Sequence, residues 1–181
     1  DVHHASELYD FLTPQFMRDH PEWRIKLADG SPDVAMDYSH EGVRAHRLAI
    51  FTELAEQYDI DGLELDFMRS CRYFAEKEAE SKQQVMTEFV GEIRTMLDRV
   101  AAERGRDRFI LGTRMPPSLD ECGSLGLDPG EWIQQGWIDY VAPSDFMWLD
   151  YGTQVEDFST LCEGTECGVY PCLNPFAAEW V

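Results

Sequence analysis

Three acidic side chains have the types and spacing to act on one reacting group. Glu64 and Asp66 alternate with apolar residues in the run 61–67, sequence DGLELDF, so a strand there would carry both carboxylates on one face. Asp145 follows a second apolar run, 138–143. Two carboxyl groups at one pocket can divide acid–base work, because one donates a proton while the other attacks or activates water. We predict Asp66 as nucleophile or base and Asp145 as acid, and Glu64 as either an acid–base group or a hydrogen-bonded structural partner.

Arginine and aromatic side chains flank these acids and could complete a binding site. Arg114 ends the apolar run 109–114, so we expect it to pair with Glu64 or Asp66. Arg69 either holds an anionic group of a ligand or fixes the following loop through a salt bridge. The predicted binding aromatics are Tyr73, Trp148 and Tyr151, and the predicted packing aromatics are Phe74 and Phe146. Against its catalytic role, Asp145 could instead cap a turn.

Strands and helices alternate along the chain, which is typical of a parallel sheet with crossover helices. The expected strands cover 34–38, 62–67, 109–114, 138–143 and 168–172. The expected helices cover 41–58 and 82–104, with two shorter ones beginning at Asp128 and Thr153. Links from helix to strand are short and links from strand to helix are long. We therefore place the functional face at the carboxyl ends of the strands.

Local signals mark several helix ends. Ser39 is the expected N-cap of the first long helix, and the run 128–131, sequence DPGE, begins a shorter one. Thr153 and Glu156 form a second expected capping box. Gly105 is expected to end the long helix at 82–104 in the left-handed conformation that glycine favours.

Two parallel architectures fit this order of elements. One is an α/β (β/α)8 TIM barrel of which about strands three to seven are present, since a complete barrel needs about 250 residues. The other is an open parallel α/β sheet, although no Gly-x-Gly-x-x-Gly turn supports its dinucleotide-binding form. We treat 1–181 as one partial catalytic-type domain, with an irregular segment at 1–34 in which 6–17 could hold a short helix. A partial barrel leaves two unpaired sheet edges, so we expect this chain alone to aggregate or to need a partner.

Charge limits the partners of this protein. The chain carries 35 acidic against 15 basic residues, a formal net charge of −20. Nucleic acid and anionic membrane surfaces are not expected partners, because both require a basic patch. No apolar run approaches the about 20 residues of a membrane span. We expect a soluble acidic protein, in the periplasm or outside the cell rather than in the cytoplasm, and the oligomeric state is left open.

Metal and cysteine chemistry receive little support. A metal-dependent barrel enzyme using Glu64 and Asp66 as ligands is disfavoured, because no histidine stands at an expected strand end. We expect neither a metal nor a cofactor. The five cysteines include no Cys-x-x-Cys pair, so we expect free thiols, with one disulfide among Cys162, Cys167 and Cys172 as the alternative.

The segment 58–69, sequence YDIDGLELDFMR, resembles the fourth strand of bacterial glycoside-hydrolase-like (β/α)8 barrels, whose pattern is Tyr-x-x-Asp-Gly-[Ile/Leu]-x-[Leu/Phe]-Asp. The runs 127–132 and 136–141 are similar to the approach of the same families to their sixth strand. The resemblance covers about residues 20–172. It implies a glycosidase-like TIM barrel with a carbohydrate substrate.

The resemblance also implies roles for single residues. Barrels that cleave α-galactosides take an Asp nucleophile from the fourth strand and an Asp acid from the sixth, which correspond to Asp66 and Asp145 here. Family 18 chitinase-like enzymes carry an acid where this chain has Met68, so their substrate-assisted mechanism is not expected. The implied function is hydrolysis of a polysaccharide or oligosaccharide by paired carboxylates, with Trp148 as a stacking residue. A barrel that binds glycans without cleaving them is the alternative.

Overall fold

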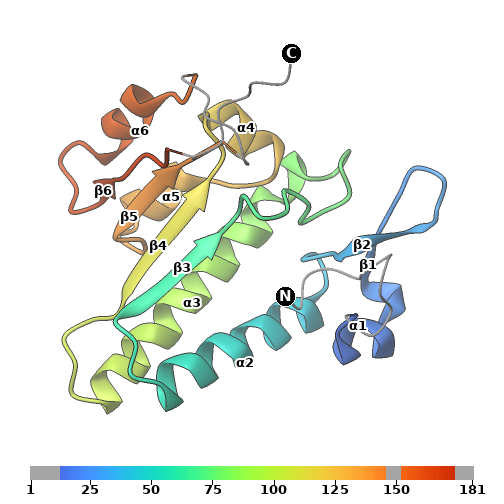
Figure 1. Cartoon of the computed structure of the whole chain (residues 1–181), viewed down its shortest axis with the longest axis horizontal. Helices are drawn as coiled ribbons and strands as arrows, with labels where there is room; N and C mark the ends of the chain where they lie inside the picture. Colours follow the sequence, from blue (N-terminus) through green and yellow to red (C-terminus); the bar gives the residue numbers. More distant parts are fainter. Residues whose placement is uncertain (1–12, 146–151, 174–181) are drawn as a thin grey trace.

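A four-stranded parallel sheet forms the centre of the computed structural model, which describes residues 13–145 and 152–173. Its strands are β3 (Gly62–Asp66), β4 (Ile110–Met115), β5 (Tyr140–Pro143) and β6 (Gly168–Val169). They lie in the order of the sequence, and each neighbouring pair is parallel (Figure 1). The fold is therefore α/β with an open parallel sheet, and a complete barrel is not shown in the described ranges.

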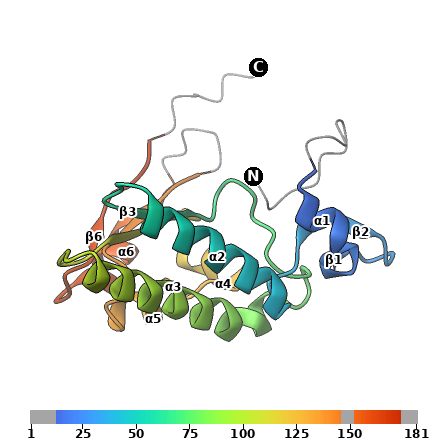
Figure 2. The same ribbon diagram turned by 90° about the horizontal axis from the view of Figure 1, so that it is seen from below.

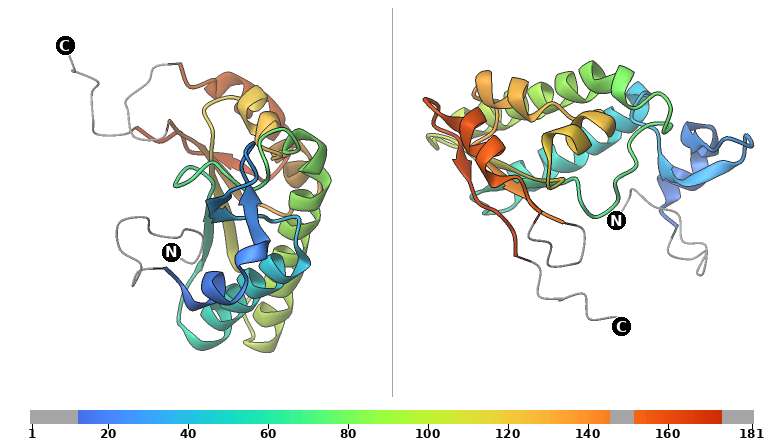
Figure 3. Two further views of the ribbon diagram at one scale, coloured as in Figure 1. Left: turned by 90° about the vertical axis from the view of Figure 1, so that its right-hand side faces the viewer. Right: turned by 90° about the horizontal axis from the view of Figure 1, so that it is seen from above.

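Helices pack on one face of this sheet. They are α2 (Glu41–Gln57), α3 (Gln83–Glu103), α5 (Pro129–Gln134) and α6 (Val155–Cys162). The views in Figure 2 and Figure 3 show α2, α3 and α5 on the same side of the strands, and α3 contacts both of the others. The opposite face stays open over Ile110, which is 49% exposed.

The hydrophobic core lies between the strands and α3. Every second strand residue points toward the helices, and the buried apolar ones include Leu65, Leu111, Met115 and Val141. The predicted apolar stripe of the long helix is confirmed in the core by Phe89, Ile93, Met96, Leu97 and Val100. The indole of Trp132, fully buried, donates to the Thr87 hydroxyl at 3.1 Å, so even the polar atom of this large ring is satisfied.

The expected strand at 34–38 belongs to a different sheet, which corrects the count of five barrel strands. The structure forms β1 (Arg24–Lys26) and β2 (Pro32–Met36) as an antiparallel hairpin apart from the parallel sheet. The turn between them is closed by the Leu27 N–H, which donates to the Ser31 carbonyl at 2.8 Å, and by Gly30 at φ +85°. This segment therefore pairs locally with β1 and does not extend the parallel sheet beside β3.

Part of the segment 1–34 is also more regular than expected. It holds α1 (Gln15–Asp19) and a 3-10 turn, η2 (Pro21–Trp23), in addition to β1. The predicted short helix at 6–17 begins outside the described residues and is found only as α1. A second short 3-10 turn, η3 (Glu80–Lys82), leads into α3.

Helix ends follow the local signals in half of the cases. Asp128 accepts from the Glu131 N–H at the start of α5, and Gly105 ends α3 at φ +65°, so both predictions are confirmed. Ser39 and Thr153 do not cap, because α2 and α6 begin after His40 and Gln154 without a side-chain cap. The prediction of those two caps was wrong.

The amino end of the sheet is tied together by arginines. Arg94 of α3, buried, donates to the Phe109 carbonyl at 2.8 Å and pairs with Asp98 at 2.5 Å. Asp139 accepts from the Leu111 N–H at 2.7 Å. Polar side chains at this end therefore satisfy backbone groups and join helix to strand.

Candidate functional site

The carboxylate of Asp66 stands at the carboxyl end of β3, on the sheet face that points away from α2 and α3. It accepts from the Met68 N–H at 2.9 Å, which fixes the turn after the strand. The Arg114 guanidinium, from the end of β4, lies 3.3 Å from the same carboxylate. Register places the two residues directly opposite each other. The expected pairing of Arg114 with one of the strand acids is confirmed.

Arg114 also reaches the residues that follow β5. Its Nη2 donates to the Ser144 hydroxyl at 3.1 Å and to the Asp145 carbonyl at 3.3 Å. The Ser144 hydroxyl donates to that same carbonyl at 2.7 Å. The Arg114 guanidinium therefore links the end of β3 to the turn after β5. Asp66 and the Asp145 turn both lie at the carboxyl end of the sheet. The pairing of the two carboxyl groups as nucleophile and acid stays a prediction.

Glu64 lies on the same face, one row toward the middle of the sheet. Its carboxylate accepts from the Tyr140 hydroxyl at 2.7 Å, across the whole width of β4. The ring can cross because Gly112 stands between them, where a Cβ would lie 1.9 Å from the Tyr140 ring. Of the two expected partners of Arg114, Glu64 is therefore not the one found, since Glu64 is exposed on the open face and has a tyrosine partner.

The environment of Tyr140 changes its acidity. Desolvation raises the pKa of its hydroxyl above the ordinary value, and the hydrogen bond to the negative Glu64 carboxylate raises it further. The phenol therefore stays protonated and keeps donating to Glu64 at any pH near neutrality. Its T-shaped neighbour Tyr170, 5.7 Å away between ring centroids, is 64% exposed on the same face.

Sequence reasoning missed three residues of this face: Tyr140, Ser144 and Tyr170. The period-2 signal could have found them, because Tyr140 and Ser144 fall in the same phase of β5, and Tyr170 follows Gly168 in the phase of β6. A further missed element is α4 (Leu119–Ser124), where a loop was expected. Its Ser118 cap accepts from the Glu121 N–H at 3.2 Å, a capping box visible in the sequence.

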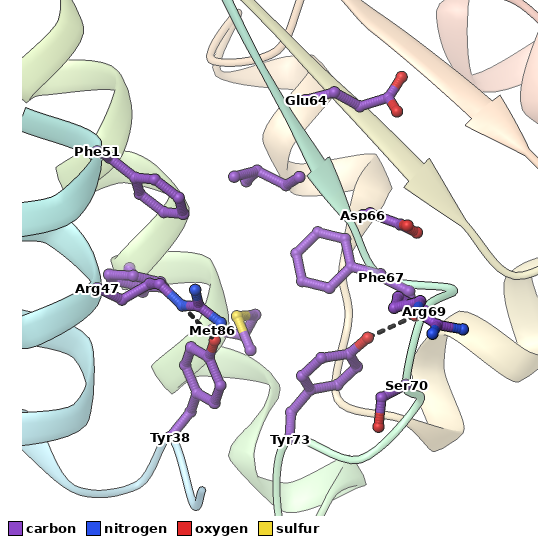
Figure 4. A pocket seen from close by; sticks show the side chains of 12 residues that line it. Tyr38, Arg47, Phe51, Glu64, Asp66, Phe67, Arg69, Ser70, Tyr73 and Met86 are labelled. Carbon is purple, nitrogen blue, oxygen red and sulfur yellow. Dashed lines mark hydrogen bonds between the residues drawn. The ribbon is translucent and has the colours of Figure 1, made fainter. Parts of the chain in front are cut away.

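A cavity of about 270 Å³ opens beside the end of β3, between that strand and α2 (Figure 4). Arg47 and Phe51 face it from α2, and Glu64, Asp66 and Arg69 line it from the strand and its loop. This volume is slightly below the ~300–1,000 Å³ typical of ligand pockets. The cavity therefore suits a small ligand, or one unit of a larger one.

Two predicted binding residues differ in how they face this cavity. Tyr73 lines it with its ring but is buried, and its hydroxyl donates to the Phe67 carbonyl. Burial raises the pKa of that hydroxyl well above its ordinary value. Its main contacts are packing contacts, an edge-on ring at Phe67 and another at Tyr38. Arg69 is exposed at the rim, and the structure shows no salt bridge for it in the part of the chain that it describes.

Other sequence predictions lie outside the site as described. Trp148, Tyr151 and Phe146 fall on 146–151, outside the described residues.

Within residues 13–145 and 152–173, no group of three acidic, histidine or cysteine side chains is arranged to hold a metal ion. In the same ranges, no helix combines the length and the apolar character needed to traverse a bilayer.

Comparisons with known proteins give a distant structural likeness and no match of sequence families. No protein-family model matches the chain, and no curated protein matches it. Among solved structures, the chain is similar to a glycoside hydrolase family 18 N-acetylglucosaminidase from Paenibacillus barengoltzii, with 20% sequence identity and a TM-score of 0.48. The match covers 59% of this chain and 30% of that enzyme. The function of this chain is therefore inferred from the geometry of its own residues.

Proposed function

We propose that this chain carries part of the active site of a glycoside hydrolase that acts on a polysaccharide or oligosaccharide. The observation that supports it most is the Arg114 guanidinium, which contacts both the Asp66 carboxylate and the Asp145 carbonyl. Glycosidic cleavage uses two carboxyl groups at one pocket, and these two acids lie at or just after the carboxyl ends of β3 and β5, which β4 separates.

The sheet is proposed to be one arc of a barrel. Its strands follow one another in sequence order, and α2, α3 and α5 cover a single face. A doubly wound open sheet instead carries helices on both faces and reverses its strand order at a switch point. The polar row of Glu64, Asp66 and Arg114 would then face the barrel axis, where chemistry takes place.

Each acid has a proposed role. Asp66 is the nucleophile or base, because Arg114 and the Met68 N–H orient its carboxylate toward the open face. Asp145 is the general acid that protonates the leaving oxygen. Glu64 is a structural partner of Tyr140 rather than the acid, since its carboxylate already accepts a 2.7 Å hydrogen bond.

The open face offers surfaces for sugar binding. The exposed ring of Tyr170 and the neighbouring ring of Tyr140 suit the C–H faces of a pyranose. Arg69 at the cavity rim supplies a cation for an anionic substituent or a hydroxyl of the ligand. Trp148 and Tyr151 stay proposed stacking residues.

A non-catalytic glycan-binding chain is the second candidate. It is favoured by the extent to which the strand acids already have partners: Glu64 accepts from Tyr140, while Asp66 accepts from both Met68 and Arg114. An acid engaged in this way positions a ligand as readily as it performs catalysis.

A hydrolysis assay on a panel of chromogenic glycosides and oligosaccharides separates the two candidates. For a hydrolase, Asp66→Asn lowers kcat by about 10²–10⁴-fold and leaves sugar binding in place. The matched control is Asp120→Asn, an acid in the first turn of α4 outside this site, which retains full activity. Glycan binding without turnover by the wild-type full-length protein favours the second candidate. Turnover that survives Asp66→Asn removes this residue from the mechanism.

A further inference from the structure

The turn between α6 and β6 brings two cysteines together. Cys162 is the last residue of α6, and Cys167 directly precedes β6. The Thr165 hydroxyl donates to the Cys162 carbonyl at 2.9 Å and accepts from the Cys167 N–H at 3.2 Å. Gly164, at φ +75°, lets the chain fold back within this short turn. One threonine thus holds the backbones of both cysteines.

The side chains of the two cysteines also meet. Both residues are buried, and both belong to the main hydrophobic core. Each thiol influences the acidity of the other, as neighbouring groups do across a short turn. The Cys167 thiol also donates to the neighbouring Gly168 carbonyl at 3.8 Å. No other pair of cysteines in the described part of the chain shows a contact between thiols.

We propose that Cys162 and Cys167 form a disulfide that closes this turn and anchors β6, the last strand of the sheet. The oxidant is a small-molecule disulfide such as oxidised glutathione. One cysteine attacks it as the thiolate, which forms a mixed disulfide and releases one glutathione. The second cysteine then displaces the other glutathione, so one S–S bond forms in the protein, one is broken in the oxidant, and two thiols leave.

The buried environment of the two thiols affects the rate of this exchange. Burial raises the pKa of both thiols, and the pKa of Cys167 reaches about 12, with the nearby Cys162 adding to the effect. Thiolate is the attacking species, so formation is slow near neutrality and quickens as the pH rises. A structural disulfide of this kind suits an oxidising compartment, which the expected periplasmic or extracellular location would supply.

Anchoring β6 also affects the position of side chains on the open face of the sheet. Tyr170 follows β6 directly, and its N–H donates to the Val141 carbonyl at 2.9 Å. Its ring packs edge-on against Tyr140. A covalent link at Cys167 would therefore hold this aromatic pair in register as well as raise the melting temperature. This consequence does not depend on the protein being a hydrolase.

Oxidation of the native chain with oxidised glutathione at about pH 8.5, the ordinary thiol pKa, tests the proposal. Thiols counted after denaturation fall from five to three, starting from the five cysteines of the chain. The intact mass drops by two hydrogens, and peptide mapping joins positions 162 and 167. The melting temperature rises by about 4–8 °C, the shift expected for a short closed loop in a domain of this size.

Variants identify the pair. Cys162→Ser and Cys167→Ser each keep all four remaining thiols under the same treatment, whereas the control Cys71→Ser falls from four thiols to two. The wild-type mass alone decides the outcome if a variant fails to fold. Stable glutathione adducts without loss of hydrogens, a linkage to Cys172, or five free thiols after prolonged oxidation would each overturn the proposal.

Discussion

The two ends of the parallel sheet use the same residue types for different purposes. At the amino end, arginines donate to backbone carbonyls: Arg94 to Phe109 and Arg106 to Ile60. At the carboxyl end, Arg114 instead spans the side chain of Asp66 and the turn after β5. Cations at the first end complete the hydrogen bonding of the fold. At the second end they orient carboxylates on an open face, where a ligand has access.

This difference follows from the links that join the elements. Short helix-to-strand links at the amino end leave backbone carbonyls close to arginines in and just after α3, so these arginines can donate to them within the fold. Longer links at the carboxyl end leave the strand acids exposed beside a cavity. On the proposed function, the amino ends of the strands serve stability and their carboxyl ends serve chemistry. Four predictions test that separation.

The largest loss of stability is expected at the amino end of the sheet. Arg94→Met removes the buried guanidinium but keeps most of its volume, which leaves the Phe109 carbonyl and Asp98 without their donor. We expect the free energy of unfolding to fall by about 3 kcal/mol in urea denaturation. Arg99→Met is the matched control on the same helix, because its pairs with Glu103 and Glu56 are exposed. An equal decrease in the free energy of unfolding for the two variants would contradict a stabilising role for this end of the sheet.

A smaller loss of stability is expected at Gly112, against which the Tyr140 ring lies. Gly112→Ala places a methyl group within the ring and displaces it from Glu64, at a cost of about 1–2 kcal/mol. In a Tyr140→Ser background the same methyl has room, and alanine then stabilises the strand by about 0.5–1 kcal/mol.

Gly123→Ala in α4 is the control, since nothing lies within 4 Å of the added methyl. Denaturation of the four variants of the Gly112 and Tyr140 cycle measures the coupling between the two positions. A cost for Gly112→Ala that is independent of residue 140 would show that the ring contact does not set it.

Tyr140→Phe isolates the hydroxyl of the same ring. Loss of its hydrogen bond to Glu64 is expected to cost about 0.5–1.5 kcal/mol. Because the folded pKa of Tyr140 is raised, its contribution is complete below the unfolded tyrosine pKa of about 10 and is lost as the pH rises above it. Wild-type stability should therefore fall more steeply than that of Tyr140→Phe above pH ~10, measured by denaturation at several pH values. Parallel curves would refute the linkage.

The smallest stability effect is expected at the carboxyl end itself. Asp66→Asn replaces a carboxylate that is 40% exposed, and its ion pair with Arg114 is open to solvent on that side. We expect the free energy of unfolding to change by less than about 1 kcal/mol, even where hydrolysis is lost. Urea denaturation of the Asp66→Asn variant, run alongside the activity assay, measures this change in the free energy of unfolding. A large loss of stability would place Asp66 with the structural arginines of the other end.

Local patterns predicted much of this molecule correctly. The alternation in 61–67 placed Glu64 and Asp66 on one face, and the helical stripe from Phe89 to Val100 is buried. Both follow from the geometry of a single element, whose periods of 2 and 3.6 are visible in the sequence. The pairing of Arg114 with a strand acid was also predictable, because parallel neighbours bring their ends together.

Pairing between distant segments could not be predicted in the same way. Residues 34–38 have the composition of a barrel strand but join a local hairpin, since short loop closure costs less entropy than a distant pairing. Tyr140 could not be assigned to Glu64, because that contact depends on the register of three strands and on a glycine in the middle one. The exposure of Glu64 likewise depends on what covers the open face.

The amino-acid sequence by itself determined which residues are apolar, which alternate, and where most of the helices and strands lie, because these properties depend on neighbours a few positions away. Only the tertiary structure decided which strand pairs with which, that one guanidinium joins Asp66 to the Asp145 turn, and that Cys162 meets Cys167. Those contacts depend on strand register and on how turns bring residues together in space, and no local pattern specifies either.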